Sequence, residues 1–175
     1  MKKNIKCELD QTSLDKAMKE LTDYKNSIND KLRQLVTLLL QDGIEVAKAS
    51  LASTVGDSDV AGTVADGFIV DSSGDIVKAI VFLSGKDVLF IEFGAGIYYN
   101  NGNAHPKASA LGYGVGTYPS EHPPNRAINP GYWWYKGDDN ANHLSLGTMA
   151  SMPMYHAAEN MRNKAIMRAM EVFRS

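Results

Sequence analysis

Cysteine is nearly absent from this chain of 175 residues, and the single one, Cys7, stands close to the N-terminus. One cysteine cannot form an intramolecular disulfide, so we expect a hydrophobic core to hold the fold together in a reducing compartment. The first residues of a chain are commonly mobile, which makes an incidental thiol the simplest interpretation of Cys7.

Long hydrophobic runs are missing as well. The chain begins with MKKNIKCELD, a basic start that no apolar stretch follows. No later segment has the roughly 18 apolar residues in succession that a membrane-spanning helix needs. The sequence therefore predicts neither export by a standard signal nor insertion into a membrane.

An excess of positive charge is also lacking, because 18 Lys and Arg residues face 20 Asp and Glu residues. Tight binding of nucleic acid by counterion release needs a basic surface, so we do not expect it here. Apolar residues make up 44% of the chain, which is too high for a disordered protein. The length suits one core, and we predict a single domain over residues 1–175.

What the chain does contain begins with a helical pattern. From Thr12 onward apolar residues recur at spacings of three, four and seven, which predicts an N-terminal helix over residues 12–52 capped by Thr12 or Ser13. Gly43 marks a position where that helix could kink. The part from Ser13 to Leu40 alone would be about 42 Å long at 1.5 Å per residue. We expect it to pack partly on its own sheet and partly on something else.

Residues 66–93 have the β-branched and aromatic content of a β-meander. The predicted strands, joined by turns at SSGD and SGKD, are Gly67 to Asp71, Ile76 to Leu83 and Val88 to Phe93. In the third strand Leu89, Ile91 and Phe93 would share one apolar face, which should belong to the core.

Residues 97–151 show no periodicity and are rich in Gly, Pro and aromatic residues, so we predict a long irregular loop. A C-terminal helix over residues 153–173 follows, with Pro153 in its first turn, where the missing N–H does no harm. The predicted fold class is α+β: the N-terminal and C-terminal helices pack on one face of a small antiparallel sheet that carries a long loop insertion.

Motifs for catalysis or for cofactors are weak. GYGVGT does not join a strand to a helix, as a phosphate-binding loop would, and the adjacent Asp138 and Asp139 fit a solvated turn better than a cation site. The histidines His105, His122, His143 and His156 lack zinc-ligand spacing, and the serines Ser84, Ser109, Ser120 and Ser145 lack a nucleophile elbow. We therefore expect no enzyme, no catalytic residues, no metal and no cofactor.

The strongest local feature is GYWWYKG, with four successive aromatic residues, Tyr132, Trp133, Trp134 and Tyr135. Such side chains are costly to leave in water. They could fold back as a lid on the protein's own sheet, bind a sugar, or anchor a protein partner. Tyr98, Tyr99 and Tyr113 of the same loop would belong to that partner interface.

Taken in order along the chain, these segments resemble the neck, or tail-completion, family of long-tailed bacteriophages, which includes head-tail joining and minor tail components. The family pattern is a strand ending in Glu-Phe-Gly-small-Gly and, later, a proline-marked entry into the last helix. The matching residues here are Glu92, Phe93, Gly94, Ala95 and Gly96, and then Pro153, Met154 and Tyr155. The match covers most of the chain, although the loop between the two elements is longer than in compact family members.

The resemblance implies a non-enzymatic virion protein, assembled in the bacterial cytoplasm, that forms a ring between the capsid portal and the tail tube. Its partners would be further copies of itself, connector proteins on the portal side, and tail terminator or tail-tube proteins. DNA would pass through the lumen without specific binding, and no membrane would take part. The alternative is a carbohydrate- or ligand-binding module that uses the aromatic residues Tyr132 to Tyr135.

Two physical expectations accompany the resemblance. Gly94 and Gly96 would let the backbone turn sharply off the sheet. Glu92 would be structural, because a carboxylate beside such a turn can accept hydrogen bonds from backbone N–H groups.

Overall fold

The computed structural model describes residues 5, 8, 10–71, 76–95, 105–111, 133–137 and 139–174. Its helices are α1 (Gln11–Ala52), α2 (Val88–Phe93), the 3-10 helix η1 (Ser109–Leu111) and α3 (Pro153–Arg174). Its strands are β1 (Val64–Asp71), β2 (Val77–Ser84), β3 (Trp133–Lys136) and β4 (Asn142–Ser145). The predicted α+β class is confirmed: a long N-terminal helix and a C-terminal helix accompany a small antiparallel sheet.

Helix α1 is one uninterrupted helix from Gln11 to Ala52. Its N-cap is Asp10, whose Oδ1 accepts the Ser13 N–H at 2.9 Å, so the predicted caps at Thr12 or Ser13 lie two or three residues too late. Gly43 does not interrupt the helix. A Cβ there would lie 2.7 Å from Sδ of Met161 and 3.2 Å from Cγ2 of Val81, so glycine lets α1 approach both of its neighbours closely.

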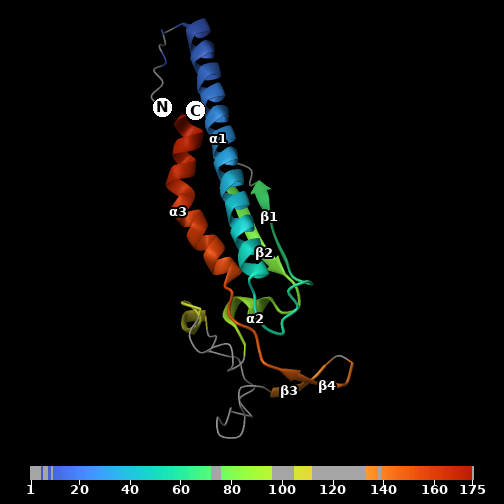
Figure 1. The fold of residues 1–175 in the computed structure, drawn as a ribbon. Coiled ribbons are helices and arrows are strands. Elements are labelled where there is room, and N and C mark those ends of the chain that lie inside the picture. The colour runs from blue at the N-terminus through green and yellow to red at the C-terminus, as the bar shows by residue number, and fades with distance from the viewer. Residues whose placement is uncertain are drawn as a thin grey trace.

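Helix α1 lies between α3 and the β1–β2 hairpin (Figure 1). The two strands pair antiparallel from Val64 opposite Ser84 to Asp71 opposite Val77. Three buried alanines, Ala47 of α1, Ala65 of β1 and Ala157 of α3, form the core cluster, and Leu83 packs against it. These small side chains let α1, α3 and the β1–β2 hairpin pack closely against one another. Helix α3 packs mainly on α1 and makes only a minor contact with β2.

The predicted third strand of the meander is wrong, because Val88–Phe93 is the short helix α2. A six-residue apolar run cannot be assigned to strand or helix from periodicity alone. In the helix Ile91 and Glu92 are buried while Leu89 is exposed, so the proposed apolar face of Leu89, Ile91 and Phe93 does not exist. The sheet under α1 has two strands.

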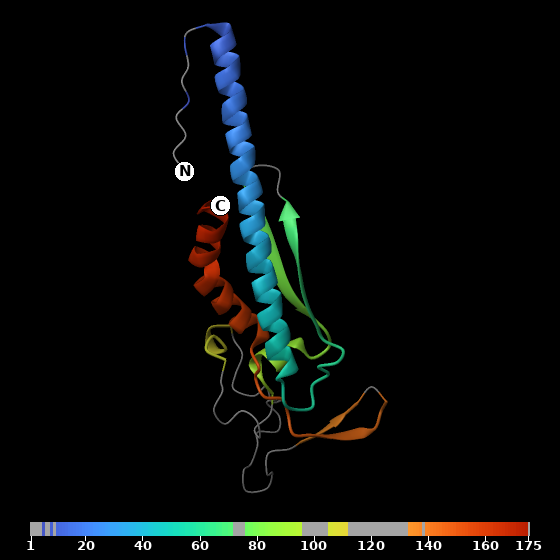
Figure 2. The same cartoon turned by 45° about the horizontal axis from the view of Figure 1, so that its top comes forward.

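The prediction of an irregular loop over residues 97–151 is also wrong in part. Strands β3 and β4 pair antiparallel from Trp133 opposite Ser145 to Lys136 opposite Asn142. This second hairpin projects away from the body of the molecule at the end opposite to the start of α1 (Figures 1 and 2).

The N-terminal half of α1 projects in the other direction, beyond the ends of α3 and of the β1–β2 hairpin (Figure 2). Leu14, Met18 and Leu21 are exposed there, and Met18 retains 66% of its accessible surface. Within the described ranges, none of the helices combines the length and the apolar composition that crossing a bilayer needs.

Candidate functional site

Residues 146–152 connect β4 to α3 and are hydrogen-bonded on both sides. Thr148 exchanges two backbone hydrogen bonds with Ala95, both 2.8 Å long, and the Met149 N–H donates to the Val55 carbonyl at 2.8 Å. Gly56, at φ 134°, faces Gly147 so closely that a Cβ would collide with the Gly147 carbonyl oxygen. The end of α1, the end of α2 and the start of α3 therefore meet in one junction.

Helix α3 starts in this junction without a cap of its own. Met152, at φ 53°, occupies the residue before the helix, and its apolar side chain cannot accept a hydrogen bond from the first turn. Pro153 has no N–H to satisfy. The next two N–H groups, those of Met154 and Tyr155, are the free donors that need an acceptor.

Glu92 of α2 supplies that acceptor from a distant part of the sequence. Its Oε2 accepts the Met154 N–H at 2.8 Å and its Oε1 accepts the Tyr155 N–H at 3.0 Å. The carboxylate therefore acts as the N-cap of α3, where the helix dipole also favours a negative charge. This bears out the expectation that Glu92 accepts backbone hydrogen bonds, although its donors belong to a helix and not to the adjacent turn.

His105 completes the surroundings of Glu92. Its Nδ1 accepts the Lys107 N–H at 3.1 Å, so the proton lies on Nε2, which donates to Oε1 of Glu92 at 3.1 Å. The imidazole is buried between two rings, with its centroid 4.5 Å from that of Phe93 and 5.2 Å from that of Tyr155.

A buried histidine beside a buried glutamate is also a pair found in active sites. Here both ring nitrogens of His105 and both carboxylate oxygens of Glu92 already have hydrogen-bond neighbours within the fold. A general base must reach a substrate proton, and both of these side chains are buried. The geometry is therefore that of a structural cap for α3.

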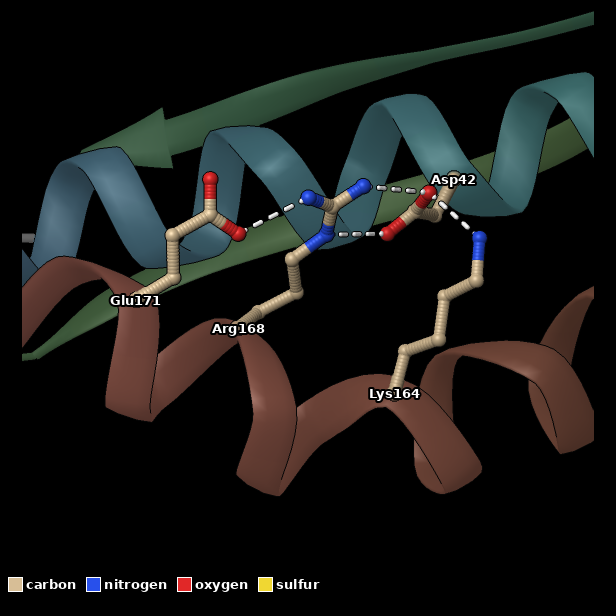
Figure 3. A network of polar contacts seen from close by, with 4 residues as sticks. All are labelled: Asp42, Lys164, Arg168 and Glu171. Carbon is tan, nitrogen blue, oxygen red and sulfur yellow. Dashed lines mark hydrogen bonds and ion pairs between the residues drawn. The ribbon is translucent and has the colours of Figure 1, made fainter.

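A second buried carboxylate, Asp42, lies midway along the α1–α3 contact (Figure 3). Its Oδ1 accepts Nζ of Lys164 at 2.7 Å, while Nε and Nη2 of Arg168 donate to Oδ2 and Oδ1 at 2.8 and 3.0 Å. Arg168 also donates from Nη1 to Glu171 at 2.9 Å. The Arg168 hydrogen bonds are the main reason why the pKa of Asp42 falls from 3.8 to about 2, although burial opposes the shift.

The residues of the predicted structural motif come together at the junction. Glu92 and Phe93 end α2, and Pro153 begins α3. Gly94 has φ 79°, a conformation that favours glycine, so the chain does turn sharply here, off a helix and not off a sheet. Gly96 lies outside the described residues.

Most of the predicted interface residues fall outside the described part of the chain. Those residues are Tyr98, Tyr99, Tyr113 and Tyr132, together with the side chains of Trp133 and Tyr135. Trp134 is described: it retains 64% of its surface and lies directly opposite the exposed Leu144 in the β3–β4 hairpin. For Trp134 the idea of a lid folded onto the protein's own sheet is therefore wrong.

Sequence reasoning missed the role of two groups. His105 was considered only as a metal ligand, and nothing in the sequence places it beside Glu92. Asp42 did carry a signal, since it interrupts the apolar pattern of α1 between Leu40 and Ile44. A charge at such a position indicates a partner on the facing element.

Of the remaining candidates for metal or cation binding, His122 and Asp138 lie outside the described residues, and the described ones form no site. Across the described ranges, nowhere do three His, Cys, Asp or Glu side chains gather as metal ligands. Asp139 lies in the turn of the β3–β4 hairpin, accepts the Ala141 N–H at 3.0 Å, and pairs with His143 at 2.9 Å. The bond to His143 is the main reason why the pKa of Asp139 is lowered.

The chain was compared with known protein families, curated proteins and solved structures. No protein-family model matches the chain, and neither a curated protein nor a solved structure matches it.

Proposed function

We propose that this chain is a structural subunit of the neck of a long-tailed bacteriophage, where it forms a ring that completes the tail and joins it to the capsid portal. The observation that carries the proposal is the apolar surface that is exposed among the described residues. This surface lies on the N-terminal half of α1 (Met18), on the outer face of the β1–β2 hairpin (Phe68) and on the projecting β3–β4 hairpin (Trp134). Extended apolar patches of this kind are typical of proteins that function in assemblies.

The junction supports the same proposal. The two segments on which the family resemblance depends, Glu92–Gly94 and Pro153–Tyr155, lie 60 residues apart in the sequence and meet where Glu92 caps α3. Their residue types are explained by this contact: an acidic cap, a glycine at positive φ, and a proline at the first helical position. The motif is therefore a folding motif, which fits a non-enzymatic protein.

The proposed partners follow from the ring. Further copies of the chain would be neighbours within it, connector proteins would bind on the portal side, and tail terminator or tail-tube proteins on the other. A formal net charge of −2 would let DNA pass through the lumen without specific binding. The protein would be assembled in the bacterial cytoplasm and would reside in the virion.

The test is in vitro joining of heads and tails. Heads and tails from a phage that lacks the gene are mixed with the purified protein, and joined particles are counted by negative-stain electron microscopy. We expect joining only when the protein is present, with a ring of density at the neck. Normal particles assembled without the protein would contradict the proposal.

The alternative, a carbohydrate-binding module, is tested with Trp134→Ala and the matched control Leu111→Ala, which removes another exposed apolar side chain, in η1. An assembly role predicts that Trp134→Ala lowers the yield of joined particles and leaves the melting temperature unchanged. Glycan-array binding that Trp134→Ala abolishes, with joining intact, would favour the carbohydrate-binding module.

A further inference from the structure

The exposed stripe on the N-terminal half of α1 continues the face that is covered in the C-terminal half. Met18 and Val36, like Leu21 and Leu39, are separated by five turns at about 3.6 residues per turn, so each pair lies on one line along the helix. Val36 and Leu39 are partly buried, whereas Met18 and Leu21 are exposed. The helix therefore keeps a core-type face over a length where the described part of the chain leaves it exposed.

The outer face of the β1–β2 hairpin is a second apolar surface that is exposed among the described residues. Phe68 and Ile80 are a directly opposed cross-strand pair, Phe82 lies beside Phe68 with ring centroids 6.0 Å apart, and Val64 continues the face along β1. Phe68 retains 51% of its surface. The inner face is covered by α1, since a Cβ at Gly67 would lie 2.6 Å from Cδ1 of Leu40. A two-stranded sheet is marginal by itself and gains stability from a second layer.

We propose that these two surfaces bind each other between neighbouring copies: the stripe Met18, Leu21, Lys25 of one subunit packs on the outer face Asp66, Phe68, Val70 of the next. The lengths agree. From Met18 to Lys25 the helix rises about 10 Å, and from Asp66 to Val70 the strand extends about 13 Å. The hairpin would then lie between its own α1 and the α1 of a neighbour.

The charges along the two surfaces agree as well. Lys25 follows Leu21 by one turn on the stripe, and Asp66 lies between Val64 and Phe68 on the outer face of β1. One helical turn, about 6 Å, is close to the 6.6 Å between alternate residues of a strand. With Lys25 opposite Asp66 and the helix antiparallel to β1, Leu21 lies opposite Phe68 and Met18 opposite Val70, which is the register that we propose.

A contact between two different surfaces of the same chain is head-to-tail, and head-to-tail contacts generate rings when the rotation closes. The inference therefore rests on the proposed ring and names the surfaces that build it. Two other pairings are available to the same surfaces, α1 with α1 and hairpin with hairpin. Each of those is isologous and would stop at a dimer.

Cross-linking tests the register. In a Cys7→Ser background, Leu21→Cys and Phe68→Cys are made singly and together and treated with a short bis-maleimide. We expect no cross-link for either single variant alone, a dimer when the two are mixed, and a ladder of multimers for the double variant. A self-cross-linked Leu21→Cys would show α1–α1 pairing, a self-cross-linked Phe68→Cys would show hairpin–hairpin pairing, and absence of any cross-link up to about 1 mM protein would show no association. Any of these three results would overturn the proposal.

Charge insertion provides an independent test by sedimentation velocity. Met18→Lys and Phe68→Lys should each leave the melting temperature near that of the native protein and remain monomeric, because each lacks one side of the contact. Their mixture should form heterodimers and nothing larger. The intact stripe of Phe68→Lys can bind the intact outer face of Met18→Lys, and the two remaining surfaces are both disrupted. Ile166→Lys, at an exposed apolar position of α3, is the matched control and should associate like the native chain. Association of either single variant alone, or loss of association in Ile166→Lys only, would overturn the proposal.

Failure of this inference differs from failure of the proposed function. Joining of heads and tails that survives both Met18→Lys and Phe68→Lys would reject the interface and keep the neck function. Multimers that form through the interface but do not join heads to tails would reject the neck function and keep the interface.

Discussion

Asp42 and Glu92 are both nearly inaccessible carboxylates, with 4% and 7% of their surfaces exposed, yet their surroundings have little in common. Asp42 lies midway along two packed helices and is neutralised by Lys164 and Arg168, whose side chains remain partly exposed. Glu92 lies at the start of a helix and accepts hydrogen bonds from two backbone N–H groups and from Nε2 of His105. The first carboxylate links two helices through charge, while the second determines where α3 begins.

The largest expected effect comes from removing the cap. Glu92→Ala leaves the N–H groups of Met154 and Tyr155 and the Nε2–H of His105 without their acceptor in a buried junction. We expect a loss of about 3–5 kcal/mol in the free energy of unfolding, measured by urea denaturation.

Glu92→Gln is the matched control for that change. The amide retains one acceptor oxygen and turns an N–H₂ group toward a backbone donor, so it should cost less than alanine, about 1–3 kcal/mol. Equal stability of Glu92→Ala and the native protein would show that α3 begins at Pro153 without help from Glu92.

The next effect concerns Asp42. Asp42→Asn removes the negative charge between Lys164 and Arg168, but both cations can turn toward water because they are partly exposed. We therefore expect a smaller loss than at Glu92, about 1–3 kcal/mol by the same urea measurement. Glu159→Gln breaks an exposed pair with Arg162 on the same helix and should change the stability by less than about 0.5 kcal/mol. Similar values for the two variants would mean that burial does not strengthen the Asp42 contacts.

The pH dependence of stability gives a further test of the Asp42 ion pairs. The pKa of Asp42 in the folded chain is about 2 instead of 3.8, so its contribution is complete above about pH 4 and disappears as the pH falls through 2. That contribution corresponds to about 2 kcal/mol. The difference in stability between the native protein and Asp42→Asn should therefore shrink between pH 4 and 2 in pH-dependent urea titrations. A difference that stays constant across this range would contradict the ion pairing.

A smaller effect than at either buried carboxylate is expected for His105→Phe. The ring remains between Phe93 and Tyr155, while Glu92 loses one of its three donors and keeps the two from α3. We expect a loss of about 1 kcal/mol, seen as a modest fall in melting temperature. A loss as large as that of Glu92→Ala would mean that the imidazole, and not the helix start, is the main partner of the carboxylate.

The sequence predicted the two long helices well and the short elements poorly. The pattern over 12–52 repeats many times, so local errors shift only its ends, as the cap at Asp10 shows. The six residues of Val88–Phe93 are too few for the apolar pattern to distinguish a helix from a strand. The β3–β4 hairpin was not predicted, because its strands have four residues each and lie in a segment rich in Gly and Pro. The role of Glu92 as an acceptor was predicted, whereas its donors, 62 and 63 residues away, were not.

Local patterns by themselves determined the class of the fold, the extent of α1 and α3, and the proline that opens α3, because these features depend on interactions within a few residues. Tertiary structure alone decided that Glu92 caps α3, that Asp42 meets Lys164 and Arg168, and that Gly43 lies where α1 contacts both neighbours. Each of these joins segments far apart along the chain, and no local preference encodes which distant partner a buried carboxylate or a glycine will meet.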